Sequence, residues 1–404
     1  MKIVDVSGFY SDTGGGVRSY VLQKLERAAQ AGHELTVIAP GSASRVEAKG
    51  GGKIVWVAAP VMPFDANYRV FRKAQTAAVW RVLDAELPDV VEGSSPWRGG
   101  YIAGTWPGGA VKALVYHQDF VAGYPYTYLG RLMSRQTIDS LFTPFWDYVV
   151  RLSQRYDVTV TGGDWLARRL AGFGVHNPVA VPFGIEPGHF TPAMRDETLR
   201  RDLLARCGLG PEAKLLLTVG RFHPEKQHRT IIEGFAMARA ARDDLGLVVI
   251  GDGMTRPTVE RLAAKAGRVY LHGAVSDRDA LAKIYASGDA LVHGSGAETY
   301  GLVVAEALSS GLPVVAPDSG GAADLADQGP SVLYSTGDAK ACAAAILDLL
   351  SRNAADWPPV RVGSAREHFE NLFSLYETLL RQKKSVDNVS SGQGQPSLPE
   401  GPRA

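Results

Sequence analysis

Hydrophobic residues come in short apolar runs along this chain, and a longer amphipathic stretch follows each run. Short buried strands that alternate with helix-like stretches are typical of βαβ units in a parallel sheet. The pattern covers the first half of the chain and then starts again. Strands are predicted at residues 3–6, 35–39, 54–57, 90–91, 113–116 and 158–161, and then at 215–219, 247–250, 269–271, 290–292, 314–316 and 332–333. The sequence therefore predicts an α/β protein with two successive doubly wound parallel sheets.

A segment rich in proline and glycine separates the two series of strands. It starts with Val181-Pro182-Phe183-Gly184-Ile185-Glu186-Pro187 and continues in polar sequence to Pro192, a composition typical of an interdomain connection. We predict an N-terminal domain over residues 1–185 and a C-terminal domain with terminal helices over 186–382. From residue 383 the chain is rich in Ser, Gly, Gln and Pro, so residues 383–404 are predicted to be a disordered tail.

Composition narrows the class of protein. The chain has 404 residues, 45% hydrophobic and 21% charged, with 43 basic and 42 acidic side chains. These values exclude a small disulfide-stapled module and disorder over most of the chain. The two cysteines, Cys207 and Cys342, form no CxxC motif, which argues against a zinc site and suits a reducing compartment. With no apolar run long enough to cross a bilayer, we expect a cytoplasmic protein whose membrane contacts, if any, are peripheral.

Ligand-binding residues are expected in the loops that follow strands, because ligands of open α/β sheets bind beyond the carboxyl ends of the strands. After the strand at 215–219 comes Gly220-Arg221-Phe222-His223-Pro224-Glu225-Lys226, which places two cations on a short loop before a helix. Cations and a helix N-terminus together make an anion site. The alternative is that Arg221 and Lys226 are ordinary surface charges, and this loop alone does not decide between them.

A glycine-rich loop with paired glutamates follows the strand at 290–292. It reads His293-Gly294-Ser295-Gly296-Ala297-Glu298-Thr299-Tyr300-Gly301, and Glu306 comes eight residues after Glu298. A helix is predicted to begin near Gly301, with Val303, Val304, Ala307 and Leu308 as its packing stripe. Glu306 then lies off the packing face and is free to accept hydrogen bonds. Glutamate on a helix is most often solvated, but the preceding glycines and the apolar helix argue against that here.

Taken together, these motifs resemble the retaining glycosyltransferases of family 4. The resemblance rests on Gly220-Arg221 with Lys226, on Gly251-Asp252-Gly253, on Glu298 with Glu306, and on Ser310-Gly311-Leu312-Pro313-Val314-Val315-Ala316, in that order along the chain. The segment at 181–186 and the Gly14-Gly15-Gly16 loop are also similar to the family. The resemblance implies the GT-B architecture, with two Rossmann-like domains facing a central cleft. Thr299 and Tyr300 stand where the family often has Gly and Phe, so the sugar is left open.

The resemblance also implies roles for individual residues. Arg221 and Lys226 would bind the diphosphate of a nucleotide sugar, Glu306 the ribose hydroxyls, and Glu298 with nearby backbone amides the sugar. The residues implied in donor binding are Gly220, Arg221, Lys226, Gly251, Val275, Glu298, Tyr300, Gly301, Leu302, Val303 and Glu306, and those implied in catalysis are His117, Glu298, Arg221 and Lys226. Fixed cations stabilise a departing diphosphate, so we expect no metal and no cofactor besides the UDP- or GDP-linked sugar, from which a hexose moves to a hydroxyl acceptor with retention of configuration.

Candidate residues also occur in the first half of the chain. Gly15, Gly16 and Arg18 lie between the first strand and an amphipathic helix, where the backbone can approach a phosphate or an acceptor. A dinucleotide fingerprint is the rival interpretation, but Ser19 occupies its third glycine position and Pro40 stands where an acidic ribose ligand is expected. We therefore reject NAD binding. His117 directly follows the strand at 113–116, where family members often carry a histidine that faces the reacting centre.

Other segments allow two interpretations. Asp277-Arg278-Asp279 has the D-x-D spelling of metal-dependent glycosyltransferases, but it also suits a helix N-cap, which we favour. Cations and aromatics mix at residues 68–83 and 131–155. Such stretches rest on an anionic membrane, or else their aromatics pack in the core while the cations stay in water; we favour packing. In the membrane case the protein would lie at the inner face of the membrane, and the acceptor would be a lipid or a lipid-linked glycan. The cation–aromatic segments contain Arg69, Phe71, Arg72, Lys73, Trp80 and Arg81, and then Arg135, Phe142, Phe145, Trp146 and Arg151.

Three other functions remain as alternatives. A sugar-nucleotide epimerase with the GT-B architecture is the runner-up, although we identify no acid and base groups for it. A glycoside hydrolase also uses two carboxylates, but the strand-loop-helix setting of Glu298 and Glu306 disfavours it. A noncatalytic sugar-nucleotide binding protein ranks last. We expect a nucleotide sugar and a hydroxyl acceptor as partners and no nucleic acid.

Overall fold

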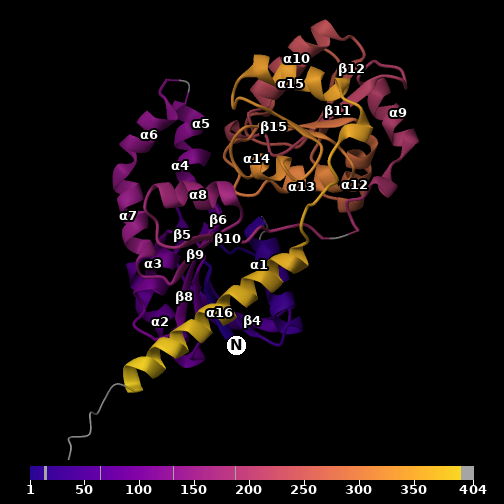
Figure 1. The fold of residues 1–404 in the computed structure, drawn as a ribbon. Helices are drawn as coiled ribbons and strands as arrows, with labels where there is room; N and C mark the ends of the chain where they lie inside the picture. Colours follow the sequence, from indigo (N-terminus) through magenta and orange to yellow (C-terminus); the bar gives the residue numbers. More distant parts are fainter. Residues whose placement is uncertain (13–15, 64, 131, 187, 393–404) are drawn as a thin grey trace, which may run out of the picture. The chain divides into compact units, whose positions relative to one another are not determined.

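The fold is built on two large sheets with helices on their faces, and a small two-stranded sheet is separate from both (Figure 1). The computed structural model describes residues 1–12, 16–63, 65–130, 132–186 and 188–392. Within these residues no helix combines the length and the apolar character that crossing a membrane requires.

The first sheet has eight strands in the order β10-β9-β8-β7-β1-β2-β4-β3. Its β3–β4 pair is antiparallel, whereas the β1–β2, β1–β7, β2–β4, β7–β8 and β9–β10 pairs are parallel. All six strands predicted in this half are confirmed, but the polar edge strand β3, the short β10 and the separate β5–β6 hairpin were not predicted. The strands are β1 (Lys2–Val6), β2 (Glu34–Gly41), β3 (Arg45–Lys49), β4 (Gly52–Ala58), β5 (Val61–Met62), β6 (Asp65–Arg69), β7 (Val90–Gly93), β8 (Val111–Tyr116), β9 (Val158–Thr161) and β10 (Pro178–Ala180).

Helices cover the first sheet through apolar clusters. Val4, Val6 and Val91 of the strands pack with Val79 of α2 and Ile102 of α3, and a separate cluster joins the end of β8 to α6, α7 and α8. The helices of this half are α1 (Gly16–Gln30), α2 (Thr76–Glu86), α3 (Arg98–Thr105), α4 (Phe120–Gly123), α5 (Pro125–Leu129), α6 (Arg135–Leu141), α7 (Thr143–Ser153) and α8 (Asp164–Gly172), with the 3₁₀ turn η1 (Lys73–Gln75).

The second sheet has six strands, all parallel, in the order β13-β12-β11-β14-β15-β16. All six strands predicted here are confirmed. The strands are β11 (Lys214–Val219), β12 (Leu245–Ile250), β13 (Val269–Gly273), β14 (Ala290–Val292), β15 (Val314–Pro317) and β16 (Ser331–Tyr334). The helices are α9 (Glu197–Arg206), α10 (His228–Ala241), α11 (Arg256–Ala266), α12 (Arg278–Ser287), α13 (Leu302–Ser309), α14 (Gly321–Ala326) and α15 (Ala339–Ser351), with η2 (Pro192–Met194), η3 (Pro224–Lys226) and η4 (Ala354–Asp356).

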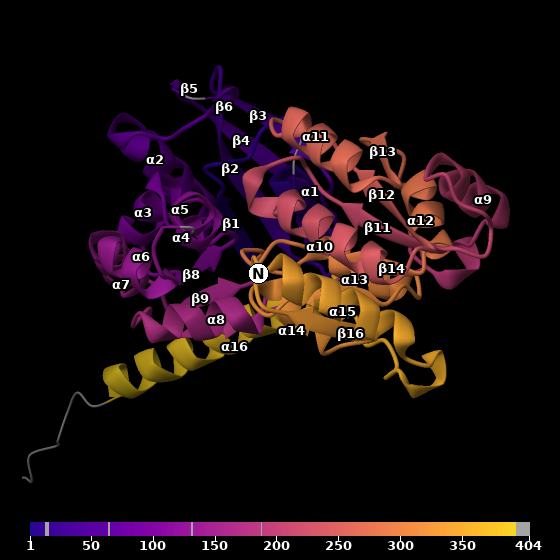
Figure 2. The same ribbon diagram turned by 90° about the horizontal axis from the view of Figure 1, so that it is seen from above.

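Alternate residues of each second-sheet strand face opposite layers of helices, as the period of two requires. Leu216 of β11 faces the cluster that includes α10, α11 and α15, whereas Leu215 and Leu217 face the cluster that includes α9, α12, α13 and α14. Figure 2 shows α10 and α15 side by side over the sheet. Both faces are buried, which explains why these strands are continuous apolar runs.

The chain divides into two compact units. The first comprises residues 1–114 and 155–157 together with the chain from Phe369 onward, and the second comprises 115–154 and 158–368. The final helix α16 (Ala365–Gly392) therefore groups mainly with the first unit, whereas we placed the terminal helices in the C-terminal domain. Aromatic contacts explain the difference: Phe369 meets the Tyr20 ring at 5.4 Å and Phe373 meets the His33 ring at 5.0 Å.

The predicted tail begins within a helix. Helix α16 continues through residues 383–392, and Lys383 donates from Nζ to the carbonyl oxygen of Ala110 at 3.0 Å, so the polar composition does not end the helix at residue 383. Residues 393–404 of the predicted tail lie outside the described residues. The boundary at residue 185 stays a prediction, and it falls between β10 and β11, the last strand of one sheet and the first strand of the other.

Candidate active site

The predicted anion loop begins where β11 ends. The amide of Gly220 donates to the carbonyl of Ile250 at 3.0 Å, and the amide of Phe222 donates to the carbonyl of Asp252 at 2.8 Å, so the loop is fixed to the end of β12. Gly251 has a φ of +143°, and a Cβ there would overlap the carbonyl oxygen of Gly220. Glycine at 251 thus lets two loops approach closely.

Lys226 and Glu298 form an ion pair at this site. Lys226 Nζ lies 2.8 Å from Glu298 Oε1 and 3.2 Å from Glu225 Oε1. Burial disfavours the charge of each group, but the two carboxylates outweigh it and raise the pKa of Lys226. Burial likewise acts to raise the pKa of Glu298, but Lys226, His293 and Arg221 together lower it. Both groups are therefore charged at neutral pH, and the exposed Arg221 adds a further positive charge nearby.

Helix α13 begins where it was predicted to begin. Its N-cap is Gly301, with a φ of +95°, a conformation that favours glycine, and a Cβ there would lie 3.2 Å from the Cα of Ala322. The amide groups in the first turn of a helix have no acceptor within the helix, so those of Leu302 and Val303 remain available to an anion. The carbonyl of Glu298 accepts from the amide of Gly321 at 2.6 Å, which fixes the loop before α13 against α14.

Glu306 lies on α13 and its carboxylate is largely buried. Tyr285 donates from its hydroxyl to Glu306 Oε2 at 3.3 Å. Burial raises the pKa of Glu306 to about 7, although Arg278 and the Tyr285 hydroxyl act in the opposite direction. The negative charge of Glu298 also acts to raise this pKa, so the two predicted glutamates are close enough to interact electrostatically.

The remaining predicted donor residues differ in accessibility. Val275 is half-buried beside the core cluster on the α13 side of the sheet. The Tyr300 ring is buried, with its centre 5.7 Å from that of Phe183, so only its backbone suits ligand contact. Gly220 lies beside the Lys226 side chain, whose Cγ would be 3.6 Å from a Cβ at 220.

His117 follows β8 and lies beside the glutamate loop. Its carbonyl oxygen accepts from the Thr299 hydroxyl at 2.9 Å, and its ring stacks on Phe183 with 5.9 Å between ring centres. Gly16 and Arg18 lie at the start of α1 in the other compact unit, and Gly15 lies outside the described residues. The structure thus brings His117, Lys226, Glu298 and Arg221 into one unit.

Two family models match this chain. Residues 14–188 match the model described as Glycosyltransferase Family 4, and residues 213–352 match Glycosyl transferases group 1. A GDP-mannose-dependent alpha-mannosyltransferase of Mycolicibacterium smegmatis is 32% identical over 339 residues, which cover 80% of this chain and 82% of that protein. The chain belongs to glycosyltransferase family 4. It is an enzyme that transfers a sugar from a nucleotide sugar to an acceptor, and the epimerase alternative is set aside.

Two further comparisons agree with the family. A GDP-mannose-dependent alpha-(1-6)-phosphatidylinositol dimannoside mannosyltransferase of Mycobacterium tuberculosis is 28% identical, over 78% of this chain and 79% of that protein. The sucrose-phosphate synthase structure from Thermosynechococcus elongatus is 19% identical and superposes with a TM-score of 0.65, covering 97% of this glycosyltransferase and 99% of that chain. The predicted GT-B fold class is thereby confirmed.

The glycosyltransferase also holds site residues that the sequence interpretation missed. Glu225 binds Lys226, Tyr285 binds Glu306, and the ring of His293 faces Glu298 with 3.5 Å between Nε2 and Oε1. His293 directly follows a strand, which is the one local signal that could have identified it. The others depend on contacts between segments distant in the sequence or on a side-chain orientation that no motif encodes.

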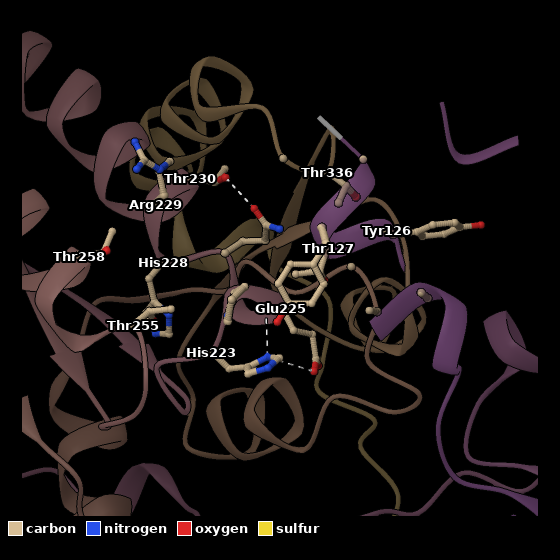
Figure 3. A pocket seen from close by; sticks show the side chains of 18 of the residues that line it. Tyr126, Thr127, His223, Glu225, His228, Arg229, Thr230, Thr255, Thr258 and Thr336 are labelled. Carbon is tan, nitrogen blue, oxygen red and sulfur yellow. Dashed lines mark hydrogen bonds and ion pairs between the residues drawn. The ribbon is translucent and has the colours of Figure 1, made fainter. Parts of the chain in front are cut away.

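A pocket of about 620 Å³ lies beside the Lys226 loop in the second unit. It is open between η3, the first turns of α10 and α11, and the segment around α5 (Figure 3). His223 and Glu225 point toward one another at its wall, with 3.9 Å between Nδ1 and Oε2. Hydroxyl-bearing residues share the lining, among them Thr127, Thr255 and Thr336, which suits a polyhydroxylated ligand.

The structure bears on two further expectations. Asp277 is the N-cap of α12 and accepts from the amides of Asp279 and Ala280, so the helix-cap interpretation is confirmed. In the cation–aromatic segments, Phe71 and Trp146 are buried and Phe142, Phe145 and Trp80 are partly buried. The cations Arg72, Lys73, Arg81, Arg135 and Arg151 are exposed, whereas Arg69 is half-buried and donates to the carbonyl of Ala59 at 2.6 Å. Most of these cations thus agree with the packing interpretation.

Proposed function

We propose that this glycosyltransferase moves mannose from GDP-mannose to a hydroxyl of a lipid or lipid-linked glycan, with retention of anomeric configuration and without a metal ion. The donor is inferred from the two mycobacterial relatives, both named as GDP-mannose-dependent mannosyltransferases. The acceptor class is inferred from the phosphatidylinositol dimannoside in the second name. Retention is inferred from resemblance to the family.

The convergence of Arg221, Lys226 and Glu298 beside the first turn of α13 carries the proposal. In the reaction the bond between the mannose anomeric carbon and the diphosphate oxygen breaks, and GDP leaves with the electron pair. The acceptor oxygen bonds to that carbon and loses its proton. Negative charge grows on the diphosphate, and fixed cations with helix amides stabilise it best in a site closed to water. Arg221 and Lys226 supply that charge, which is why the proposal needs no metal.

The other predicted residues take supporting roles. The Glu306 carboxylate accepts hydrogen bonds from the ribose hydroxyls, and Glu298 with the amides of Leu302 and Val303 holds the mannose. His117, whose backbone accepts from Thr299 next to Glu298, faces the reacting carbon from the end of β8. That Gly16 and Arg18, at the start of α1, approach a phosphate or the acceptor stays a prediction from the sequence.

Exposed apolar side chains support a lipid acceptor. Tyr128, Leu132 and Leu141, in and around α5 and α6, are 55%, 80% and 58% exposed, and the exposed Arg135 lies between them in the sequence. Apolar side chains with a cation suit the interface of an anionic membrane. These residues, rather than the packed aromatics of the predicted segments, would place the enzyme on the cytoplasmic face of a membrane.

Transfer assays with defined variants test the proposal. We expect GDP-mannose, but not UDP-glucose, to give GDP and a mannosylated lipid from a mixture of phosphoinositides, in the presence of EDTA. Lys226→Ala should lower turnover by about 10²-fold or more, because it removes charge stabilisation of the transition state. Glu298→Ala should lower turnover by about 10²-fold, because the mannose loses the carboxylate that positions it for transfer. Arg206→Ala removes an exposed cation that pairs with Asp202 on α9, outside the residues that line the pocket, and this matched control should retain activity.

The same assay separates the parts of the proposal. Wild-type turnover in both Lys226→Ala and Glu298→Ala would contradict the site, provided that thermal unfolding shows both variants folded. The anomeric proton signal of the product decides retention. Leu132→Ser with Leu141→Ser should reduce sedimentation with phosphatidylglycerol vesicles and leave turnover on a water-soluble acceptor unchanged; equal sedimentation would refute the membrane contact.

A further inference from the structure

His293 is buried beside the proposed donor site with an unused ring nitrogen. Its side chain is 3% exposed, and in the described part of the chain its Nε2 makes no hydrogen bond. The backbone is held in place, because Tyr334 donates from its hydroxyl to the His293 carbonyl at 2.8 Å. Buried polar atoms are almost always satisfied, so a buried ring nitrogen without a partner indicates a partner in another state of the enzyme.

Glu298 Oε1 is the nearest acceptor, and Lys226 already occupies it. Nε2 of His293 is 3.5 Å from Oε1, whereas Nζ of Lys226 is 2.8 Å from the same atom. Lys226 is shared further with Glu225 Oε1 at 3.2 Å. The cation assigned to the diphosphate is thus neutralised by two carboxylates before any donor binds.

A diphosphate competes with these carboxylates for Lys226. As the ammonium turns to the phosphate oxygens, Glu298 loses its only short hydrogen bond from a cationic side chain in the described residues. A buried carboxylate without a partner is strongly unfavourable, so it needs another donor. A shift of a few tenths of an ångström brings His293 Nε2 into the range of 2.7–3.2 Å that N–H···O hydrogen bonds take.

We propose that His293 is a positioning residue. When Lys226 moves to the donor diphosphate, His293 Nε2 replaces it as the hydrogen-bond donor to Glu298 Oε1, an exchange called the handover below. The handover keeps Oε1 anchored and leaves Oε2 directed at the sugar throughout the reaction. It rests on the proposed function, since it requires a diphosphate at Lys226.

The charges around His293 suit this role. Four titratable groups face it: Glu298, Lys226 and Glu225, and His228 from α10. Burial lowers the pKa of His293, and the Lys226 charge acts in the same direction. The free ring is therefore neutral and donates to Glu298 only with its proton on Nε2, whereas a backbone hydrogen bond at Ser295 favours the charged ring, in which both nitrogens donate. A bound diphosphate offsets the Lys226 charge, so the pKa of His293 should rise when GDP binds, and protonation would strengthen the bond to Glu298.

Two variants and one spectroscopic signal test the handover. A glutamine amide has nearly the reach of Nε2, whereas leucine fills the space and cannot donate. Titration calorimetry with GDP should show a Kd about tenfold higher for His293→Leu, the worth of one hydrogen bond to a charged group, and within about threefold of wild type for His293→Gln. In the wild-type enzyme, the ¹⁵N resonance of His293 Nε2 should move to the position of a hydrogen-bonded N–H when GDP is added.

The outcomes decide separately on the two proposals. Any of three results would overturn the handover. They are an unchanged Kd for GDP in folded His293→Leu, a Kd for His293→Gln as high as that of His293→Leu, and an Nε2 resonance that does not move when GDP is added. Should His293→Leu fail to fold, the glutamine variant and the wild-type spectrum still decide. Wild-type protein that binds UDP in place of GDP would refute the proposed donor, and the same measurements with UDP would then decide on His293.

Discussion

At the scale of single residues, the ribose contact proposed for Glu306 predicts a pH dependence of donor binding. Its pKa is about 7 in the free enzyme because burial disfavours the charge. Ribose hydroxyls donate hydrogen bonds, so the donor prefers the ionised carboxylate, and binding releases a proton where Glu306 is still protonated. GDP affinity should therefore be constant above about pH 8 and fall by up to about tenfold per pH unit well below the pKa.

Calorimetry of GDP binding between pH 6 and 8, in buffers of different ionisation enthalpy, measures both the affinity and the proton release. Glu306→Gln should bind GDP more weakly at pH 8 and show a flatter pH profile, because the amide does not titrate. An unchanged profile in this variant would show that another group, such as the phosphate itself, causes the dependence.

At the residue scale, the sequence predicted some residues of the candidate site but not their side-chain partners. Lys226, Glu298 and Glu306 were predicted as site residues because their motifs follow strands, and parallel strands bring their carboxyl ends to one edge. The roles of Glu225, Tyr285 and His293 depend on side-chain geometry: Tyr285 reaches Glu306 from the preceding helix, and Glu225 turns back to Lys226 only within the 3₁₀ turn. No local pattern encodes such contacts.

At the scale of elements, Arg169 of α8 connects the segments that follow β8. Its guanidinium binds Asp119, the N-cap of α4, and Asp139 of α6 at 2.8 Å, and it lies over the rings of Trp146 and Phe173 at 5.3 and 5.1 Å. Asp119 is fully buried. Removal of the cation would leave that carboxylate uncompensated, so Arg169→Met should lower the free energy of unfolding of the second unit by about 3–5 kcal/mol.

Urea unfolding followed by far-UV circular dichroism measures this loss. Arg168→Met is the matched control, because its side chain is mostly exposed and pairs at 2.8 Å with the largely buried Asp324. Asp324 keeps a hydrogen bond from the amide of Trp165, so loss of the exposed cation should cost only about 1 kcal/mol. Equal losses in the two variants would contradict a special role for Arg169. The double variant Arg169→Met with Asp119→Asn should recover part of the stability, since it removes the unpaired charge.

At the scale of the whole molecule, the strands were predictable and the partner of α16 was not. Twelve strands follow from apolar runs because both faces of a parallel sheet are buried. The edge strand β3 has a polar sequence and is largely exposed, so it gave no such signal. The sequence of helix α16 does not specify which core its apolar residues contact. Its packing on the first unit depends on ring contacts with Tyr20 and His33, which are more than 300 positions away in the sequence.

In the first unit, a fully buried ionic cluster links α1 to β1 and β7. This cluster leads to a prediction for the stability of that unit. Lys24 of α1 lies 3.1 Å from Asp5 Oδ2 of β1 and also binds Glu92 of β7, and all three side chains are 0% exposed. Ser94 donates to Asp5 at 2.6 Å. One ammonium thus faces two carboxylates. Burial raises the pKa of Glu92 above its usual value, against the opposing charge of Lys24.

A carboxyl group whose pKa is raised on folding binds its proton more tightly in the folded state, so stability falls as pH rises from about 4.5 to the folded-state pKa. Glu92→Gln removes this fall, and it should therefore be more stable relative to wild type at pH 8 than at pH 5 in urea unfolding. Lys24→Met should instead lose about 3–5 kcal/mol at pH 8, because both buried carboxylates lose their counter-charge. If Glu92→Gln cost as much as Lys24→Met at pH 8, ionised Glu92 would be a required counter-ion of Lys24, and the direction of its pKa shift would be wrong.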